Sequence, residues 1–267
     1  MLKITINGKT YEAEKGEYVL EVCHRNRVLV PTLCHHDGVP GLGACRLCVV
    51  EVNEGGGNKV VISCVYPLGR DCEVFTESDK IKGIRKTILS MLKTMAPEGD
   101  RLASLCQIYG VKENERFTPA APVKGSSEER RLASSCVLCG LCAQACAVMG
   151  TGAISTVGRG VGKKISTPFG EPSSDCIGCA SCAVICPTKA IECTEAGGQR
   201  SIWGRKFTLL RCASCGNAFA TEEEYAWALK KAAVSEAVVE APLCDTCRKK
   251  KSADVLAAAF GERAGLN

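Results

Sequence analysis

Aromatic side chains are scarce in this chain of 267 residues, which contains six Phe, five Tyr and two Trp. Histidine occurs only three times. Because aromatic packing normally contributes much of the stability of a core, modules this poor in aromatics need a further source of stability. The length suits two or three small modules rather than one large core.

The chain also has no visible export signal and no long apolar run. The N-terminal sequence MLKITINGKTYEAEKG has no positively charged start followed by an apolar core, so no secretory leader is expected. No apolar run approaches the roughly 20 residues that cross a bilayer. The net charge of +5 is mild, and no basic stripe with interleaved aromatics indicates a nucleic-acid partner. We expect a cytoplasmic protein with no membrane span and no nucleic-acid partner.

Cysteine, in contrast, is abundant. The chain has twenty cysteines, and sixteen of them fall into four groups of four. Disulfide scaffolds belong to secreted chains, whereas repeated C-x-x-C spacing in a cytosolic chain indicates metal binding. We therefore interpret the four groups as metal sites that help to stabilise small modules.

The first group has the spacing C-x10-C-x2-C-x15-C. Four thiolates suit an iron pair, and the glycine-rich intervening sequence HHDGVPGLGACRLC lets backbone N–H groups approach inorganic sulfide. A structural zinc site would normally have two C-x-x-C knuckles, and only one is present. His35 and His36 adjoin the first ligand but are interpreted as surrounding residues rather than ligands. We predict a 2Fe–2S cluster on Cys34, Cys45, Cys48 and Cys64.

The second and third groups repeat the spacing C-x2-C-x2-C-x3-C. This is the run of bacterial two-cluster ferredoxins, in which the fourth cysteine of each motif binds the other cluster. Pro187 follows the second motif, while Ala147 replaces the usual proline after the first. We predict one 4Fe–4S cluster on Cys136, Cys139, Cys142 and Cys186, and another on Cys176, Cys179, Cys182 and Cys146.

The fourth group consists of two C-x-x-C knuckles separated by a helical insert, the arrangement typical of structural zinc. A mononuclear iron or a further 4Fe–4S cluster would use the same ligands, and spacing favours zinc without excluding either. The predicted ligands are Cys212, Cys215, Cys244 and Cys247. Because four protein ligands leave no open position, metal-assisted hydrolysis is not expected, and no catalytic residues are predicted.

The four cysteines outside these groups are Cys23, Cys72, Cys106 and Cys193. Each is interpreted as a buried apolar side chain. Cys106 is also a candidate remnant of a ligand set. The sequence GRGVGKK at 158–164 does not meet the spacing of a phosphate-binding loop, so a glycine-rich hairpin is predicted. The run RKKK at 248–251 is interpreted as a solvated charge run.

The cysteine groups divide the chain into four segments of an α+β protein. The first is an α/β 2Fe–2S domain, the second a helical connector and linker, the third a two-cluster ferredoxin domain, and the fourth a four-cysteine tail. Their predicted boundaries are 1–78, 79–130, 131–198 and 199–267.

Periodicity predicts the elements inside these segments. In the first segment, Asn7-Gly8 indicates a hairpin between strands at 2–6 and 9–13, followed by a helix at 17–27 and strands at 48–52, 60–64 and 72–75. A connector helix follows Ser78 or Asp79 and ends before Pro97, with a Pro-rich linker at 118–127. In the tail, Thr221 and Glu224 form a capping box, and a short helix begins near Ser252.

The order of these motifs resembles a known family. A β-grasp 2Fe–2S domain followed by a two-cluster ferredoxin resembles the N-terminal part of the large iron–sulfur subunit of respiratory complex I. In size the chain is more similar to the small diaphorase subunit of soluble NAD-linked NiFe hydrogenases, and to the corresponding subunits of electron-bifurcating hydrogenases and NAD-linked formate dehydrogenases. The resemblance covers roughly residues 1–198.

The resemblance implies partners and a function. The partners would be a flavin-bearing NADH-oxidising subunit, a thioredoxin-like 2Fe–2S subunit, and hydrogenase or formate dehydrogenase subunits, with ferredoxin as a further partner in a bifurcating complex. The implied function is an electron relay between the flavin subunit and a hydrogenase module. An NAD-linked formate dehydrogenase subunit and a freely diffusing multi-cluster ferredoxin are the alternatives.

Two features depart from the family. Its members usually carry a His-x3-Cys-x2-Cys segment between the two domains, but the corresponding stretch MLKTMAPEGDRLASLCQIYG has no histidine and only Cys106, so we predict that this cluster is missing. The tail from Arg211 instead resembles the C-terminal extension of ferredoxin-like subunits of formate hydrogenlyase-type complexes.

Overall fold

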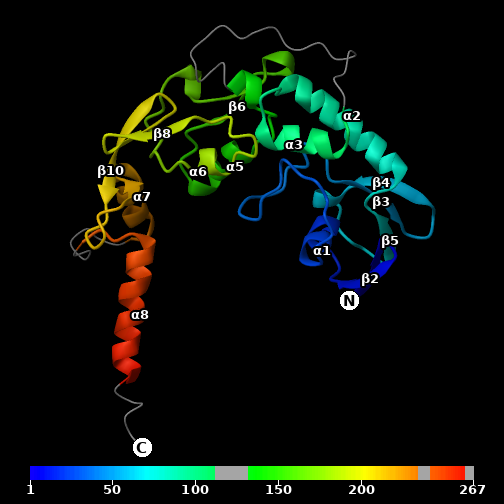
Figure 1. The fold of residues 1–267 in the computed structure, drawn as a ribbon, viewed down its shortest axis with the longest axis horizontal. Coiled ribbons are helices and arrows are strands. Elements are labelled where there is room, and N and C mark those ends of the chain that lie inside the picture. The colour runs from blue at the N-terminus through cyan, green and yellow to red at the C-terminus, as the bar shows by residue number, and fades with distance from the viewer. Residues whose placement is uncertain (112–131, 234–240, 262–267) are drawn as a thin grey trace, which may run out of the picture. The chain divides into compact units, whose positions relative to one another are not determined.

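The computed structural model describes residues 1–111, 132–233 and 241–261 (Figure 1). The predicted linker at 118–127 lies outside these ranges. The chain divides into two compact units. The first contains Met1–Phe169 and Ser181–Glu192, and the second contains Gly170–Ala180 and Cys193–Asn267.

The first unit begins with a five-stranded sheet in the order β2-β1-β5-β3-β4. Strands β1 and β5 are parallel and the other neighbours antiparallel. The inward-facing residues of β1, Ile4 and Ile6, are completely or almost completely buried, as expected for one face of an alternating strand. The elements of this domain are β1 (Leu2–Ile6), β2 (Lys9–Ala13), α1 (Val19–Arg25), β3 (Val49–Asn53), β4 (Asn58–Ile62) and β5 (Cys72–Phe75).

The hairpin predicted at Asn7-Gly8 is confirmed. Both residues have positive φ, +50° and +83°, as the tightest hairpin turn requires, and β1 pairs with β2 in the register Ile6↔Lys9. The predicted strands at 48–52 and 60–64 are also present, each displaced by one or two residues along the chain. The 3-10 turn Ser63–Val65 directly follows β4.

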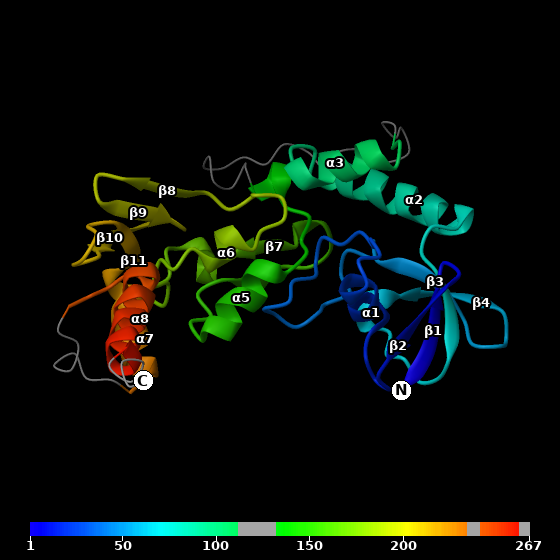
Figure 2. The same ribbon diagram turned by 60° about the horizontal axis from the view of Figure 1, so that its bottom comes forward.

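The predicted connector helix is α2 (Asp79–Met95), and it is followed by a helix that the sequence analysis missed, α3 (Asp100–Ile108). The Ser78 hydroxyl caps α2 by accepting a hydrogen bond from the Ile81 N–H at 3.3 Å. Figure 2 shows α2 and α3 side by side, and the buried residues of α3, Leu102 and Cys106, belong to the same apolar cluster as Leu89 of α2.

The remainder of the first unit contains α5 (Leu141–Met149), α6 (Ser181–Val184) and a small hairpin of β6 (Ser155–Val157) and β7 (Lys164–Ser166). A 3-10 turn at Gly160–Gly162 connects the two strands. The glycine-rich hairpin predicted at 158–164 is therefore confirmed.

The second unit contains an antiparallel sheet in the order β11-β10-β9-β8, which the sequence analysis did not predict. The capping box of Thr221 and Glu224 is confirmed at the start of α7, which packs against β10 and β11. The elements are β8 (Cys193–Ala196), β9 (Gln199–Ile202), β10 (Arg205–Arg211), β11 (Ala218–Thr221), α7 (Glu222–Lys231) and α8 (Asp245–Gly261).

The predicted start of the last helix near Ser252 is wrong, because α8 begins at Asp245. The basic run at 248–251 is helical and exposed, in agreement with its interpretation as a solvated charge run. Asp245 lies in the first turn and forms ion pairs one turn along the helix with Arg248, at 2.8 Å, and Lys249, at 2.6 Å. Among the helices that the structure describes, none has the length and apolar character needed to cross a bilayer.

Gly178 provides a test of packing in the second unit. Its φ is +68°, and a β-carbon there would lie 2.7 Å from the Phe207 ring. Gly178→Ala should lower the free energy of unfolding by about 2 kcal/mol more than Gly197→Ala. Gly197, in the β8–β9 turn, has a similar φ of +58° but open space around it. Chemical denaturation of the cluster-loaded chain measures the difference, and equal losses would show that the close contact has no energetic effect.

Candidate metal centres

The four cysteines of the first group are all buried in the first unit, each at most 5% exposed. Three of them, Cys34, Cys45 and Cys48, lie in the loop between α1 and β3. Cys48 directly precedes β3, and Cys64 lies in the turn after β4. Because β3 pairs with β4 in the register Val49↔Ile62, the strand pairing brings Cys48 and Cys64 to the same end of the sheet.

The sulfur atoms of this group interact with one another. A hydrogen bond from the Cys34 thiol, with backbone N–H groups among the further donors, lowers the pKa of Cys45 to about 6. The corresponding bond from Cys64 lowers the pKa of Cys48 to about 7. The Leu33 N–H donates to Cys45 Sγ at 3.4 Å, and the Cys45 N–H donates to Cys34 Sγ at 3.2 Å. The same two hydrogen bonds raise the pKa of Cys34 and Cys64, so two of the four groups are favoured as thiolates before metal binds. Two thiolates with N–H groups directed at sulfur fit a 2Fe–2S cluster, which would displace the remaining protons.

A buried arginine holds the backbone on both sides of Cys48. Arg85 of α2 is completely buried, and its guanidinium donates to the Leu47 carbonyl at 3.1 Å and to the Val49 carbonyl at 2.8 Å. It also donates to the Tyr109 hydroxyl at 2.8 Å and pairs with the Glu77 carboxylate. The connector helix therefore positions the C-x-x-C loop and brings a positive charge close to it.

The ligands predicted for the first 4Fe–4S cluster line one cavity in the first unit. The cavity walls also include Val137, Ile165 and Ile191, so the thiols point into apolar surroundings. The Leu138 N–H donates to Cys136 Sγ at 3.4 Å, and the Ala190 N–H donates to Cys186 Sγ at 3.3 Å. The cysteines that share this cavity are Cys136, Cys139, Cys142 and Cys186.

Burial sets the protonation of this group. Desolvation raises the pKa of Cys136 and Cys142, and it raises the pKa of Cys139 to about 12. Iron would therefore have to displace protons, after which its positive charge would compensate the buried thiolates. The donor set and the apolar walls fit a 4Fe–4S cluster.

The ligands predicted for the second 4Fe–4S cluster are divided between the units. Cys146 and Cys182 belong to the first unit, and Cys176 and Cys179 belong to the second. In the first unit, Cys146 Sγ lies 3.1 Å from the Thr151 hydroxyl, and Cys182 is buried on α6. In the second unit, Arg205 donates to the Cys176 carbonyl at 2.6 Å, which holds the loop that begins the motif. The complete ligand set remains a prediction from the sequence.

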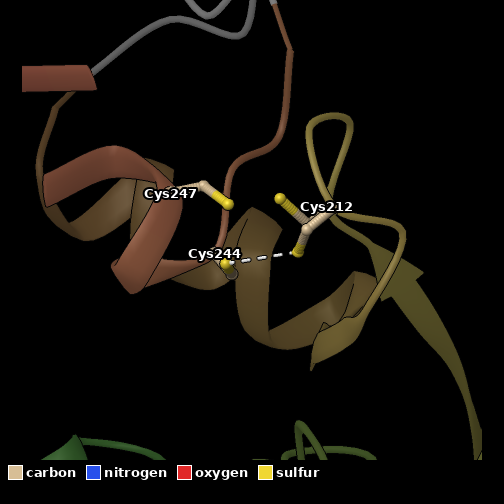
Figure 3. Close-up of side chains that lie close together, drawn as sticks. Cys212, Cys244 and Cys247 are labelled. Atoms are coloured by element: carbon tan, nitrogen blue, oxygen red, sulfur yellow. Dashed lines mark hydrogen bonds between the residues drawn. The ribbon is translucent and has the colours of Figure 1, made fainter. Parts of the chain in front are cut away.

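The four cysteines of the tail lie together in the second unit, with their sulfur atoms within 4.8 Å of one another. Figure 3 labels three of them, Cys212, Cys244 and Cys247. Cys212 and Cys215 lie in the turn after β10, and Cys247 lies in the first turn of α8. The Cys212 N–H donates to the Asn217 carbonyl at 2.9 Å, and the Ala213 N–H donates to the Pro242 carbonyl at 2.9 Å. These bonds close the first knuckle and connect it to the second, so the site could hold a tetrahedral metal.

The tail site should lose its metal on acidification. Hydrogen bonds from the Cys244, Cys215 and Ser214 N–H groups lower the pKa of Cys212 to about 6. Before metal binds, Cys212 is therefore a thiolate at neutral pH. Against a hydrogen bond from Ser214, hydrogen bonds with Cys244 and Cys215 raise the pKa of Cys247 to about 12. Metal binding must displace the Cys247 proton, so metal affinity should fall as the pH falls, and more steeply below pH 6, where Cys212 is protonated as well. Metal content after equilibration with a chelator measures this. Cys215→Ser should lose the same equivalent of metal at neutral pH. Full metal loading of that variant would contradict the assignment of Cys215 as a ligand.

The four remaining cysteines are not equivalent. Cys23 and Cys72 are buried in the core of the five-stranded domain, where desolvation raises their pKa to about 12 and about 11. Cys106 is buried beneath α2, with its thiol 3.9 Å from the Leu89 carbonyl. Cys193 is only half-buried on β8, where desolvation also raises its pKa.

The histidines beside the first group form a contact that the sequence analysis missed. His35, predicted to be a surrounding residue, is half-buried, and its ring lies edge-on to His24 of α1 with the centroids 5.5 Å apart. Desolvation and the neighbouring His24 lower the pKa of His35. His24 carried no signal in the sequence because it precedes the cysteine loop by ten residues of chain.

The loop of the first cysteine group lies directly against the motif of the second. Cys34 and Cys45 share a buried apolar cluster with Cys139, and the charge on Cys45 contributes to the raised pKa of Cys139. A β-carbon on Gly140 would lie 2.7 Å from the Leu42 side chain. The two predicted cluster sites are therefore neighbours inside the first unit.

Comparisons with known proteins identify two kinds of cluster-binding domain in this chain. A family described as "2Fe-2S iron-sulfur cluster binding domain" matches residues 1–79, and one described as "4Fe-4S binding domain" matches residues 173–192. The chain is 28% identical over 215 residues to NADP-reducing hydrogenase subunit HndD of Solidesulfovibrio fructosivorans, which covers 72% of this chain and 36% of that protein. It is 28% identical over 184 residues to the NADH-ubiquinone oxidoreductase 75 kDa subunit of Reclinomonas americana, covering 62% of this chain and 26% of that protein.

The fold is similar to a chain of a crystal structure of NAD+-reducing NiFe-hydrogenase in the H2-reduced state. The TM-score is 0.59 at 25% identity, over 70% of this chain and 85% of that one. The protein is homologous to iron–sulfur subunits of hydrogenases and NADH–ubiquinone oxidoreductases. It carries an N-terminal 2Fe–2S domain and a 4Fe–4S domain. The chain spans about a third or less of the length of these two curated relatives.

Proposed function

We propose that this protein relays electrons between a flavin-bearing, NAD(P)H-oxidising subunit and a hydrogenase module. The observation that carries the proposal is the burial of Cys45 and Cys139 in one apolar cluster, which makes the first two cluster sites neighbours. When bound, the clusters supply one-electron redox chemistry. The chain contributes buried thiol ligands, N–H donors at sulfur and apolar walls that keep water away from the sites.

The proposed cofactors are one 2Fe–2S cluster, two 4Fe–4S clusters and one metal in the tail, for which zinc is favoured. Reduction potentials of about −400 mV, as in plant-type ferredoxins, would suit electron exchange with hydrogen and nicotinamide. The domains remain those proposed from the sequence, at 1–78, 79–130, 131–198 and 199–267. We propose that no third cluster lies on this path, and the burial of Cys106 among apolar residues supports this.

The proposed partners are a flavin-bearing subunit, a thioredoxin-like 2Fe–2S subunit and hydrogenase subunits. The names of the relatives support this, because they describe NADP- and NAD+-reducing hydrogenases. The chain itself is proposed to be a non-catalytic subunit of the oxidoreductase. Many thiolate ligands require a reducing compartment, which supports a cytoplasmic location.

Native purification tests the proposal. The chain should copurify with a flavoprotein and a hydrogenase subunit, and NAD(P)H should reduce its 2Fe–2S and 4Fe–4S signals in electron paramagnetic resonance (EPR) spectra of the complex. The chain alone should not be reduced by NAD(P)H, because it is not proposed to bind flavin. Recovery of the native protein free of partners would instead favour a diffusing ferredoxin, and copurification with a formate dehydrogenase would replace the hydrogenase assignment.

A further inference from the structure

Three side chains with metal-binding groups lie beside the 2Fe–2S site without belonging to it. His24, His35 and Asp37 place one nitrogen or oxygen atom each within 4.8 Å of one another. His24 comes from α1, whereas His35 and Asp37 come from the loop that begins at Cys34. The group is therefore assembled by the fold from two separate segments.

The scaffold under this group is well connected. At the end of α1, the Arg27 N–H donates to the His24 carbonyl at 3.0 Å, and the Val28 N–H donates to the Cys23 carbonyl at 2.8 Å. On the loop side, Cys34 is buried next to His35. The segment of His24 is thus held by backbone hydrogen bonds, and the segment of His35 by the burial of its neighbour. Binding of one ion by all three side chains should therefore cost little conformational entropy.

His36 has a different role from its neighbours. Its Nδ1 accepts a hydrogen bond from the Gly38 N–H at 3.0 Å, and its carbonyl accepts one from the Val39 N–H at 3.2 Å. His36 thus closes a tight turn in the loop. Its ring is absent from the three-residue group, although it lies between His35 and Asp37 in the sequence.

We propose that His24, His35 and Asp37 bind a divalent first-row transition metal ion beside the 2Fe–2S site. Two imidazoles and one carboxylate are suitable ligands for zinc, cobalt, nickel or ferrous iron. Because His24 and Asp37 are exposed, the remaining coordination positions would be open to water, unlike the closed four-cysteine site of the tail.

A cation at this position would act on the neighbouring site. His35 adjoins Cys34, so the positive charge would favour the reduced, more negative form of the 2Fe–2S cluster and shift its potential upward. By linkage, the reduced chain would bind the ion more tightly than the oxidised chain. The ion would link the redox state of this cluster to metal availability.

Zinc titration tests the site directly. The cluster-loaded chain, with its tail site already filled with zinc, should take up one further equivalent of Zn²⁺ in a calorimetric titration. His24→Gln and Asp37→Asn should each weaken that step by at least about tenfold, equivalent to about 1.4 kcal/mol. The matched control is His36→Asn, whose side-chain oxygen can still accept from the Gly38 N–H, and it should bind like the native chain.

A second measurement locates the ion. Bound Co²⁺ is paramagnetic and should speed the relaxation of the reduced 2Fe–2S EPR signal, raising the microwave power at half saturation. At a Co²⁺ concentration that half-saturates the native chain, His24→Gln should lose most of the effect, and His36→Asn should retain it. The proposal is overturned if no further equivalent binds, if the His24 and Asp37 variants bind like the native chain, or if Co²⁺ leaves the relaxation unchanged. None of these readouts requires the chain to relay electrons.

Discussion

Cys139→Ser should remove one 4Fe–4S signal and reduce NAD-linked turnover of the assembled complex to background. Cys139 lines the cavity of the first 4Fe–4S site, is 8% exposed, and belongs to the same apolar cluster as Cys45. Serine is a poor substitute for a soft thiolate ligand, so this cluster should be lost or replaced by a smaller one. EPR of the reduced complex and NAD-dependent turnover are the two measurements.

The matched control is Cys193→Ser. Cys193 is half-buried on β8 and belongs to none of the proposed ligand sets. The complex with Cys193→Ser should retain all cluster signals and its NAD-linked turnover. If NAD-linked turnover survived in Cys139→Ser while the 4Fe–4S signal was absent, the relay through this site would be wrong. The zinc and Co²⁺ measurements at His24 would be unaffected by that result.

Arg85→Met should destabilise the first unit and shift the 2Fe–2S potential downward. The substitution roughly keeps the side-chain volume but leaves the Leu47 and Val49 carbonyls without their guanidinium donor. Each unsatisfied buried acceptor costs about 1–3 kcal/mol, so we expect the free energy of unfolding to fall by about 3 kcal/mol. The pair with Glu77 adds little to this, because that carboxylate side chain is 44% exposed.

Lys86→Met is the control for Arg85→Met. Lys86 is the next residue of α2 and is exposed, so its replacement removes the same charge without a buried contact. Chemical denaturation and an EPR redox titration of the cluster-loaded chains compare the two. The removal of a buried positive charge should lower the potential only in Arg85→Met. Equal effects of the two variants would show that Arg85 acts through net charge and not through the loop beside Cys48.

Local signals in the sequence predicted much of the fold. Asn7-Gly8 identified the first hairpin, because few residue pairs tolerate positive φ at both positions. Ser78 identified the start of α2, and Thr221 with Glu224 identified the start of α7. The sheet β8–β11 escaped prediction, since three of its four strands have only four residues each and their buried positions do not alternate regularly. The predicted start of α8 near Ser252 was wrong, since the exposed basic run before it is itself helical.

The sequence by itself determined which cysteines are available as ligands and how they group, because ligands supplied by one loop must follow a fixed local spacing. Only the tertiary structure decided what surrounds those groups. Arg85 lies 36 and 38 residues from the carbonyls that it holds. Its place at helix spacing between Ile81 and Leu89 puts it on the buried face of α2, but no local pattern identifies the carbonyls that it meets there. The contact between the Cys45 and Cys139 regions likewise depends on burial between distant segments. The contact between His24 and His35 also depends on packing between distant segments. Burial and the proximity of charges arise from packing in three dimensions, so neither produces a regular spacing of residues in the sequence.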